Sequence, residues 1–271
     1  MKLALMFLAL ISVAAPARGQ LRNNRDKELT CNNSYQNRSR ACDLQETTVG
    51  PAGMLDISPG RNGGITVKGW DQNSVLVRAR LEAWAESDAE ARALLSQVRV
   101  ESGGGRIRAV GPESDPNRPW NQGQYWAVTF EVFTPWNTNM KLESHNGGVS
   151  VSDVRGRIEL ESHNGGVKLT RVAGDISGST HNGGIQVDLE GNVWDGRQLE
   201  LSTYNGGVTL SVPASFSASI ETRTDRGRVD SDFPIAVRGR IDESNLNFNI
   251  GSGGPPIKLS THNGRIRLKR L

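Results

Sequence analysis

The chain has 271 residues, and its 32 basic and 29 acidic side chains leave a formal net charge of only +3. A charge this close to balance gives no support for a general polyanion partner, so we expect no nucleic-acid function.

The first 19 residues have the composition of a secretory signal peptide. A basic start precedes a mainly apolar run from Leu3 to Ala15, and small residues then allow cleavage after Ala17 or Gly19. The run is shorter than the about 20 apolar residues that a transmembrane helix needs, and no later segment approaches that length. We therefore expect an exported protein without a transmembrane segment, in the periplasm, outside the cell or at its surface.

Residues 20–50 form a polar leader that contains both cysteines, Cys31 and Cys42. In an oxidising compartment such a pair predicts a disulfide. The spacing is not Cys-x-x-Cys, so we interpret the bond as a local clasp rather than a redox-active pair.

Residues 51–139 are expected to form an irregular first part of the fold. Ser87 and Glu90 make a capping box, and apolar residues continue at helical spacing, which predicts one short helix over residues 88–97. A strand-like run from Tyr125 to Thr134 follows. It belongs to an aromatic cluster that we interpret as a cap over the end of the core, with ligand binding as the alternative. The cluster consists of Trp120, Tyr125, Trp126, Phe130, Phe133 and Trp136.

Residues 140–271 contain the strongest signal, because all four histidines lie in one repeated phrase, Ser/Thr-His-Asn-Gly. His145, His163 and His181 are 18 residues apart, and His262 occurs in a later copy. A fixed period of this kind indicates a repeat architecture. The turn residues of the copies are Asn146, Gly147, Asn164, Gly165, Asn182, Gly183, Asn205, Gly206, Asn263 and Gly264.

Each copy alternates apolar and polar residues, which predicts two strands with one buried face. Ile158, Leu160, Val167 and Leu169 are expected to point inward. Asn-Gly also favours β-hairpins, and an 18-residue period resembles three-sided hexapeptide helices, but the apolar positions do not recur every six residues. We predict an all-β, single-stranded β-solenoid, or β-helix, with coils of about 18 residues.

The repeat also predicts how Asn and Gly are arranged in the stacked turns. Equivalent Asn residues should lie about 4.8 Å apart, with each amide capping the backbone of a neighbouring coil. The Gly that follows Asn, as at Gly165 and Gly183, should have positive φ. Val172 with Gly174, and Leu189 with Gly191, are expected to close successive units.

The repeats then become irregular, with copies around Thr203, Thr224 and Thr261 at longer spacings. The last strand alternates Ile266 and Leu268 with basic residues, and we interpret these charges as protection of an edge strand. The basic residues are Arg265, Arg267, Lys269 and Arg270.

At this level the chain resembles a bacterial putative-adhesin family, a domain of unknown function with repeated Thr/Ser-x-Asn-Gly-x-Ile/Val turns. The residues that carry the likeness are 144–151, 162–169, 180–187, 203–210 and 261–268. The resemblance implies a β-solenoid and supplies no catalytic residues to transfer.

Two sets of polar residues in the repeats are candidate sites. His145, His163 and His181 would stack in one column that continues with Tyr204 and Asp225, and we expect an exposed turn ladder rather than a metal site. Outward carboxylates could serve a polysaccharide hydrolase, but basic residues lie among them, so a solvated mixed-charge face is expected. These carboxylates are Glu143, Glu159, Glu161 and Asp188.

Trp194 lies in the loop from Gly191 to Arg197 that lengthens one coil, and an exposed ring there predicts a ligand contact. The sequence therefore favours a secreted, non-catalytic, adhesin-like or scaffold protein without cofactor or metal. Its partner would be a cell-envelope glycan or a protein. An enzyme that acts on envelope polysaccharide is the alternative, and the oligomeric state is left open.

Overall fold

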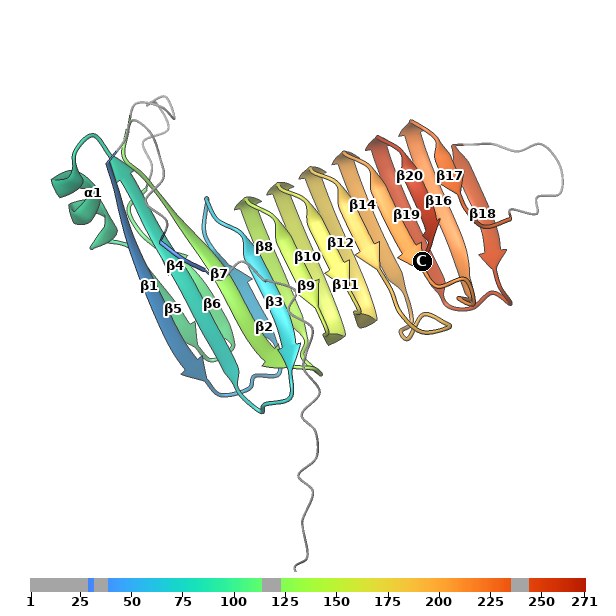
Figure 1. Cartoon of the computed structure of the whole chain (residues 1–271), viewed down its shortest axis with the longest axis horizontal. Coiled ribbons are helices and arrows are strands. Elements are labelled where there is room, and N and C mark those ends of the chain that lie inside the picture. The colour runs from blue at the N-terminus through green and yellow to red at the C-terminus, as the bar shows by residue number, and fades with distance from the viewer. Residues whose placement is uncertain (1–28, 32–38, 114–122, 235–243) are drawn as a thin grey trace, which may run out of the picture.

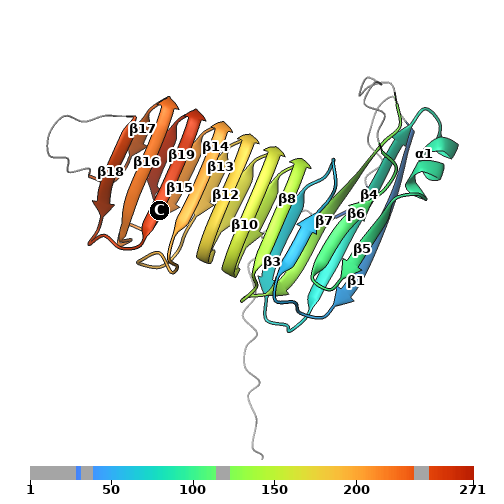
Figure 2. The same ribbon diagram turned by 180° about the vertical axis from the view of Figure 1, so that it is seen from behind.

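The computed structural model describes residues 29–31, 39–113, 123–234 and 244–271. The expected signal peptide and Trp120 lie outside these residues. Within them the fold is all-β with one helix, and the strands lie side by side across the long axis of the molecule (Figure 1, Figure 2). Among the described residues, no helix is long and apolar enough to cross a membrane.

Two ten-stranded sheets of mixed strand direction make up the fold. In spatial order, sheet A consists of β1 (Ser39–Val49), β4 (Val75–Ala85), β7 (Tyr125–Pro135), β3 (Ile65–Trp70), β9 (Val149–Ser152), β11 (Val167–Thr170), β13 (Ile185–Asp188), β15 (Val208–Val212), β20 (Ile266–Arg270) and β17 (Val229–Ser231). Sheet B consists of β18 (Asn245–Ile250), β16 (Ala218–Arg226), β19 (Pro256–Asn263), β14 (Leu199–Asn205), β12 (Ala173–Asn182), β10 (Arg155–Asn164), β8 (Met140–Asn146), β2 (Leu55–Ser58), β6 (Arg106–Val110) and β5 (Arg99–Gly103).

The 18-residue repeat appears as parallel pairing in register. Ile158 of β10 lies opposite Met140 of β8 and Ile176 of β12, and in sheet A β11 pairs in the same way with β9 and β13. The predicted inward positions are confirmed, since Ile158, Leu160, Val167 and Leu169 are all buried. The hairpin alternative is wrong for this part of the chain.

The C-terminal strands do not follow the chain order. β19 and β20 lie between β14/β15 and β16/β17, so the last coil in the sequence is inserted into the stack (the red strands in Figure 1). The interpretation of the last strand as a protected edge is therefore wrong: β20 has β15 on one side and β17 on the other. Arg265 instead pairs with Asp230 of the neighbouring coil at 3.1 Å.

The Asn residues of the repeat are consistent with this order. Asn263 Nδ2 donates to Asn205 Oδ1 at 2.8 Å, whereas the coil placed outside carries Arg226 at that position. Six side-chain amides make a continuous chain of hydrogen bonds of 2.8–2.9 Å, one from each stacked turn, from Asn62 to Asn263. Five of these Asn residues therefore donate to the side chain of the preceding Asn rather than to the backbone as expected, and only the first, Asn62, donates to a backbone group, the carbonyl oxygen of Trp126 at 3.2 Å.

The Gly after each Asn is required for a reason other than the predicted one. Gly165 and Gly183 do not have positive φ. Instead, a Cβ on Gly165 would lie 2.1 Å from the carbonyl oxygen of Gly147, and one on Gly183 would lie 2.2 Å from that of Gly165. Positive φ occurs at the opposite turn, at Asp153 and Arg171, whose side chains are paired at 2.6 Å.

The Ser or Thr that begins each phrase is buried and completes the turn. Thr180 donates its hydroxyl to the carbonyl oxygen of Gly165 at 2.7 Å, and Thr203 does the same to Gly183 at 2.8 Å. Buried carbonyl groups need such partners. This role was missed in the sequence, although Ser or Thr at every copy was the available signal.

The N-terminal part contains both antiparallel and parallel strand pairs. β4 lies between β1 and β7, and β7 in turn pairs in parallel with β3. The helix α1 (Asp88–Leu95) has the predicted capping box and packs against β1 and β4. Residues of the aromatic cluster lie in different environments. Phe130 is buried in the core, Tyr125 stacks on Trp84, and Trp136 is 56% exposed.

The predicted disulfide is present. Cys31 and Cys42 are joined with their Cα atoms 5.9 Å apart, which ties the described residues before β1 to that strand. A bond over so short a loop stabilises a fold by about 2 to 3 kcal/mol in the chain-entropy model.

Candidate functional site

The outer face of sheet B is a regular surface formed by strands of the repeat. Because strand side chains alternate, the residues at 158, 160 and 162 are buried while those at 159, 161 and 163 face outward. Parallel pairing in register then lines up equivalent outward residues from six strands: β8, β10, β12, β14, β19 and β16. The face is therefore a grid of three rows.

The first row is a stack of five rings. Their centroids are 4.5–5.0 Å apart and their planes are within 15° of parallel. In order along the sheet the rings belong to His145, His163, His181, Tyr204 and His262. We call this set the aromatic row. The predicted column is confirmed, except that His262 lies between Tyr204 and Asp225 because of the inserted coil.

Stacking determines what the aromatic row can offer to a ligand. The ring faces are covered by one another, so the edges remain available, and these carry the imidazole nitrogens and the Tyr204 hydroxyl. Tyr204 is 46% exposed and three of the four histidines are also exposed. The row is consequently a line of hydrogen-bonding groups at a spacing of about 4.8 Å, the distance between neighbouring strands.

The aromatic row ends at a carboxylate. His262 Nδ1 lies 2.7 Å from Asp225 Oδ2, on the neighbouring strand β16. The hydrogen bond from His262 lowers the pKa of Asp225 below its ordinary value, and Arg223 adds to the effect. A carboxyl group whose pKa is lowered in the folded state stabilises the fold at pH values above its ordinary pKa. This contribution is lost as the pH falls through the pKa of the folded state.

We expect His262→Ala to raise the pKa of Asp225 toward the ordinary carboxyl value, because the main hydrogen bond to the carboxylate is lost. His145→Ala, at the other end of the aromatic row, is the matched control and should leave Asp225 unchanged. Carbon-detected NMR titration of the Asp225 carboxyl measures both. An unchanged Asp225 titration in His262→Ala would contradict the assignment of this contact.

Serines occupy the middle row, beside the rings. Ser179, Ser202 and Ser260 follow one another on β12, β14 and β19, and Glu143 and Glu161 continue the row on β8 and β10. All of these side chains can bond hydroxyl or amide groups of a ligand.

The outward carboxylates are partly paired, and they do not share one surface. Glu143 is paired with Lys141 at 2.6 Å and Glu159 with Arg157 at 2.8 Å, both on sheet B. Asp188, by contrast, belongs to β13 of sheet A, where Gln186 donates to it. The structure therefore does not bring Asp188 together with the glutamates.

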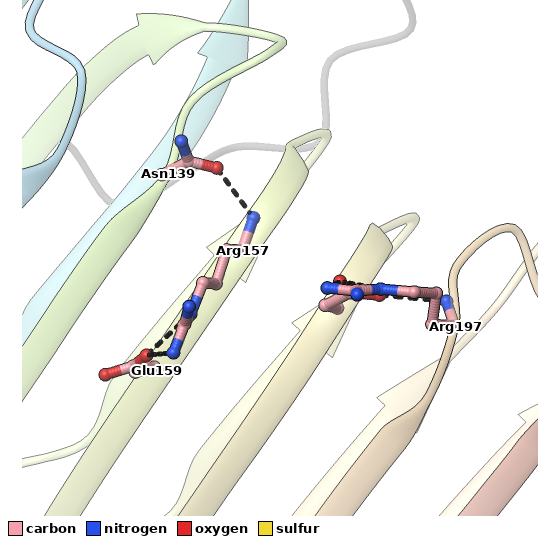
Figure 3. A network of polar contacts seen from close by, with 5 residues as sticks. Asn139, Arg157, Glu159 and Arg197 are labelled. Atoms are coloured by element: carbon pink, nitrogen blue, oxygen red, sulfur yellow. Dashed lines mark hydrogen bonds and ion pairs between the residues drawn. The ribbon is translucent and has the colours of Figure 1, made fainter.

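The border of the face opposite the aromatic row is charged (Figure 3). Asn139 Oδ1 accepts the backbone N–H of Arg157 at 2.9 Å, and Arg157 reaches along its own strand to Glu159. Arg197 donates from Nε to Asp175 at 2.6 Å and also from its backbone N–H. These hydrogen bonds from Arg197 lower the pKa of Asp175.

Three shallow, open depressions lie on this face and together cross it. One of about 350 Å³ is at the charged border, and one of about 340 Å³ lies over the glutamates and serines. The largest, about 600 Å³, runs along the aromatic row from His163 to Asp225. The surface suits an extended ligand rather than a small molecule, which proteins usually enclose in a pocket.

No group of three or more His, Cys, Asp or Glu side chains is placed to hold a metal ion in the part of the chain that the structure describes. The histidines are stacked at 4.7–5.0 Å between ring centroids, and each ring is parallel to the next.

Trp194 is in the core, so its interpretation as an exposed ligand contact is wrong. The side chain is 3% exposed and belongs to the main hydrophobic cluster. The phrase Trp194-Asp195-Gly196 takes the place of Val172-Ala173-Gly174, since a Cβ on Gly196 would meet the carbonyl oxygen of Gly174 at 1.7 Å. The ring therefore continues the inward column of Val154 and Val172, and the extra residues of the loop precede it.

A family model described as Toastrack DUF4097 matches residues 95–269. No curated protein matches the chain.

Several solved structures resemble the fold at low identity. A "putative cell adhesion protein" from Clostridium sporogenes is 14% identical, with 85% of this chain and 100% of that chain covered and a TM-score of 0.44. A "putative adhesin" from Bacteroides fragilis is 12% identical, with coverage of 85% and 97% and a TM-score of 0.29. A "putative lipid binding protein" from Parabacteroides distasonis is 11% identical, with coverage of 84% and 96% and a TM-score of 0.33.

Proposed function

The chain belongs to the Toastrack DUF4097 family, and on this premise we propose that it is an exported, non-catalytic, adhesin-like protein that binds a cell-envelope component through the outer face of sheet B. The parallel coils would act as a single-stranded β-solenoid of about 18 residues per coil, which holds the binding groups at a fixed spacing. The aromatic row is the observation that carries this proposal.

The aromatic row favours an extended ligand because its groups repeat along one line. The five rings stack on one another, and the Asn that follows each ring in the sequence is bonded to its neighbours, so little conformational entropy remains to be lost on binding. Serines and glutamates lie next to the rings and add further hydrogen-bonding groups. A polymer that lies across the strands would meet the same kind of group at each step.

The composition of the face favours a glycan over a protein. Protein interfaces have an apolar centre rich in large side chains, whereas Tyr204 is the one large, exposed hydrophobic residue among the outward positions of this face. A polyhydroxylated ligand can use hydroxyl, carboxylate and imidazole groups without such a centre. A partner protein is the alternative outcome of the binding test.

Export is supported by the disulfide, since such bonds persist in oxidising compartments. The apolar segment at residues 3–15 supports it independently.

One observation favours the alternative of an enzyme acting on envelope polysaccharide. The contact between Asp225 and His262 Nδ1 resembles the carboxylate–imidazole pairs that orient a general base. Asp225→Asn and His262→Gln would then abolish release of soluble fragments from peptidoglycan. A non-catalytic protein releases none, with or without these changes.

The binding proposal is tested by sedimentation of the protein with purified peptidoglycan sacculi, and with envelope membranes in parallel. We expect Tyr204→Ala combined with His262→Ala to weaken binding to sacculi by at least about tenfold, because central aromatic contacts contribute about 2 kcal/mol or more when they anchor a ligand. Lys168→Ala combined with Gln186→Ala is the matched control, since both side chains are exposed on sheet A.

The variant with both Tyr204→Ala and His262→Ala, here called the row variant, and the control pair on sheet A distinguish the possible results. Equal binding by the row variant and the wild type would remove the aromatic row from the site. Loss of binding in the control pair would move the site to sheet A. Binding to membranes but not to sacculi, with the same sensitivity to the row variant, would identify a membrane component as the ligand.

A further inference from the structure

β18 is the end strand of sheet B at the C-terminal end of the stack (Figure 1). On one side it pairs antiparallel with β16, where Asn247 lies opposite Glu221. On the other side, no strand pairs with it among the described residues.

The backbone groups on that edge belong to three asparagines. The N–H of Thr224 donates to the carbonyl oxygen of Ser244 at 2.8 Å, and bonded pairs recur at every second residue of an antiparallel ladder. Residues 246, 248 and 250 consequently bond β16. The N–H and C=O groups of Asn245, Asn247 and Asn249 then point away from β16.

The side chains of β18 contain nothing that opposes strand addition. Leu246, Phe248 and Ile250 are buried on the inner side, and the three asparagines are exposed on the outer side. The strand has no charge, no proline and no glycine. Uncharged six-residue segments of this type pair readily with other strands.

The other sheet ends carry the usual protection of edge strands, which is charge or short length. β5 exposes Arg99 and Glu101 at the opposite end of sheet B. β1 carries Asp43 and Glu46 at one end of sheet A, and β17 at the other end has only three residues, Asp230 among them. Only β18, of these four, is both uncharged and six residues long.

We propose that β18 pairs antiparallel with β18 of a second copy of this chain and joins the two B sheets into one. A two-fold axis through Asn247 would place Asn245 opposite Asn249 and Leu246 opposite Phe248. Amides then face amides, apolar side chains face apolar side chains, and the outward backbone groups are the ones that bond. The strand is complementary to itself, and a two-fold contact closes as a dimer rather than a filament.

Sedimentation velocity and light scattering of the full chain test the dimer. We expect a concentration-dependent dimer in the wild type and a monomer in Asn247→Lys, because two like charges would meet at the axis. Gln186→Lys adds the same charge at an exposed position of β13 and should keep the dimer. Circular dichroism checks that both variants fold.

Cysteine cross-linking tests the register. Bonded antiparallel pairs have Cα atoms about 5.5 Å apart, which is within the range of a disulfide. Asn247→Cys should therefore form a cross-linked dimer on mild oxidation. Asn245→Cys should not cross-link to itself but should cross-link to Asn249→Cys when the two variants are mixed.

A wild type that is monomeric at every concentration would overturn the proposal. A dimer that persists in Asn247→Lys, or that does not cross-link through Asn247→Cys, would place the contact elsewhere and would also overturn it.

Discussion

Gly183→Ala should destabilise the protein by about 3 to 5 kcal/mol, a loss at the upper end for a single methyl group. The added Cβ would lie 2.2 Å from the carbonyl oxygen of Gly165 and 2.8 Å from the nitrogen of Gly166. These are backbone atoms of the neighbouring coil, so no side chain can turn away to make room. Relief would separate two coils that the Asn182–Asn164 bond of 2.9 Å holds together.

The next residue provides the matched control. A Cβ on Gly184 would meet the carbonyl oxygen of Gly207 at 3.4 Å, which is ordinary contact, and neither glycine has positive φ. Gly184→Ala should therefore cost less than about 1 kcal/mol. Urea unfolding of both variants measures the difference. Similar stability in the two would contradict the close-approach explanation, and Gly165→Val, which meets Gly147 at 2.1 Å, should be at least as damaging.

Trp194→Ala should cost about 3 to 5 kcal/mol of stability, because it leaves a large cavity in the inward column of the coil. The ring is 3% exposed. Its indole N–H has no acceptor among the described residues, so Trp194→Phe, which keeps most of the ring volume, should cost much less.

Val193→Ala is the control for Trp194, since the neighbouring side chain is 47% exposed in the same loop. It should change the free energy of unfolding by no more than about 0.5 kcal/mol. Equilibrium unfolding in urea compares the three variants. A stable Trp194→Ala protein that loses binding to sacculi would restore the ring as a ligand contact.

The repeat was predictable where equivalent positions carry the same residue type. Parallel strands, inward Ile158 and Leu160, and the column of histidines all followed from the 18-residue period, because stacking requires each coil to resemble its neighbours. The capping box at Ser87 likewise predicted the one helix, since capping depends on a few adjacent residues.

What escaped prediction depends on contacts between coils that are distant in the sequence. The insertion of β19 and β20 leaves no mark on the spacing from Thr224 to Thr261, although Asn263 instead of Arg226 was a usable signal. The burial of Trp194 could have been found by alignment of Trp194-Asp195-Gly196 with Val172-Ala173-Gly174. The chain of hydrogen bonds between Asn side chains could not have been predicted, because the direction of a side chain at a turn is not encoded by residue type alone.

The outer face of sheet B is proposed to contact the envelope ligand, and histidine-selective modification tests this proposal most directly. All four histidines of the chain belong to the aromatic row, so the histidine adducts of diethyl pyrocarbonate report on that row alone. Peptide mass spectrometry with and without bound sacculi, together with lysine labelling of Lys168 and Lys269 on sheet A, compares the two faces. We predict protection of His163, His181 and His262 and unchanged lysine labelling; unchanged histidine modification with protected lysines would contradict the claim.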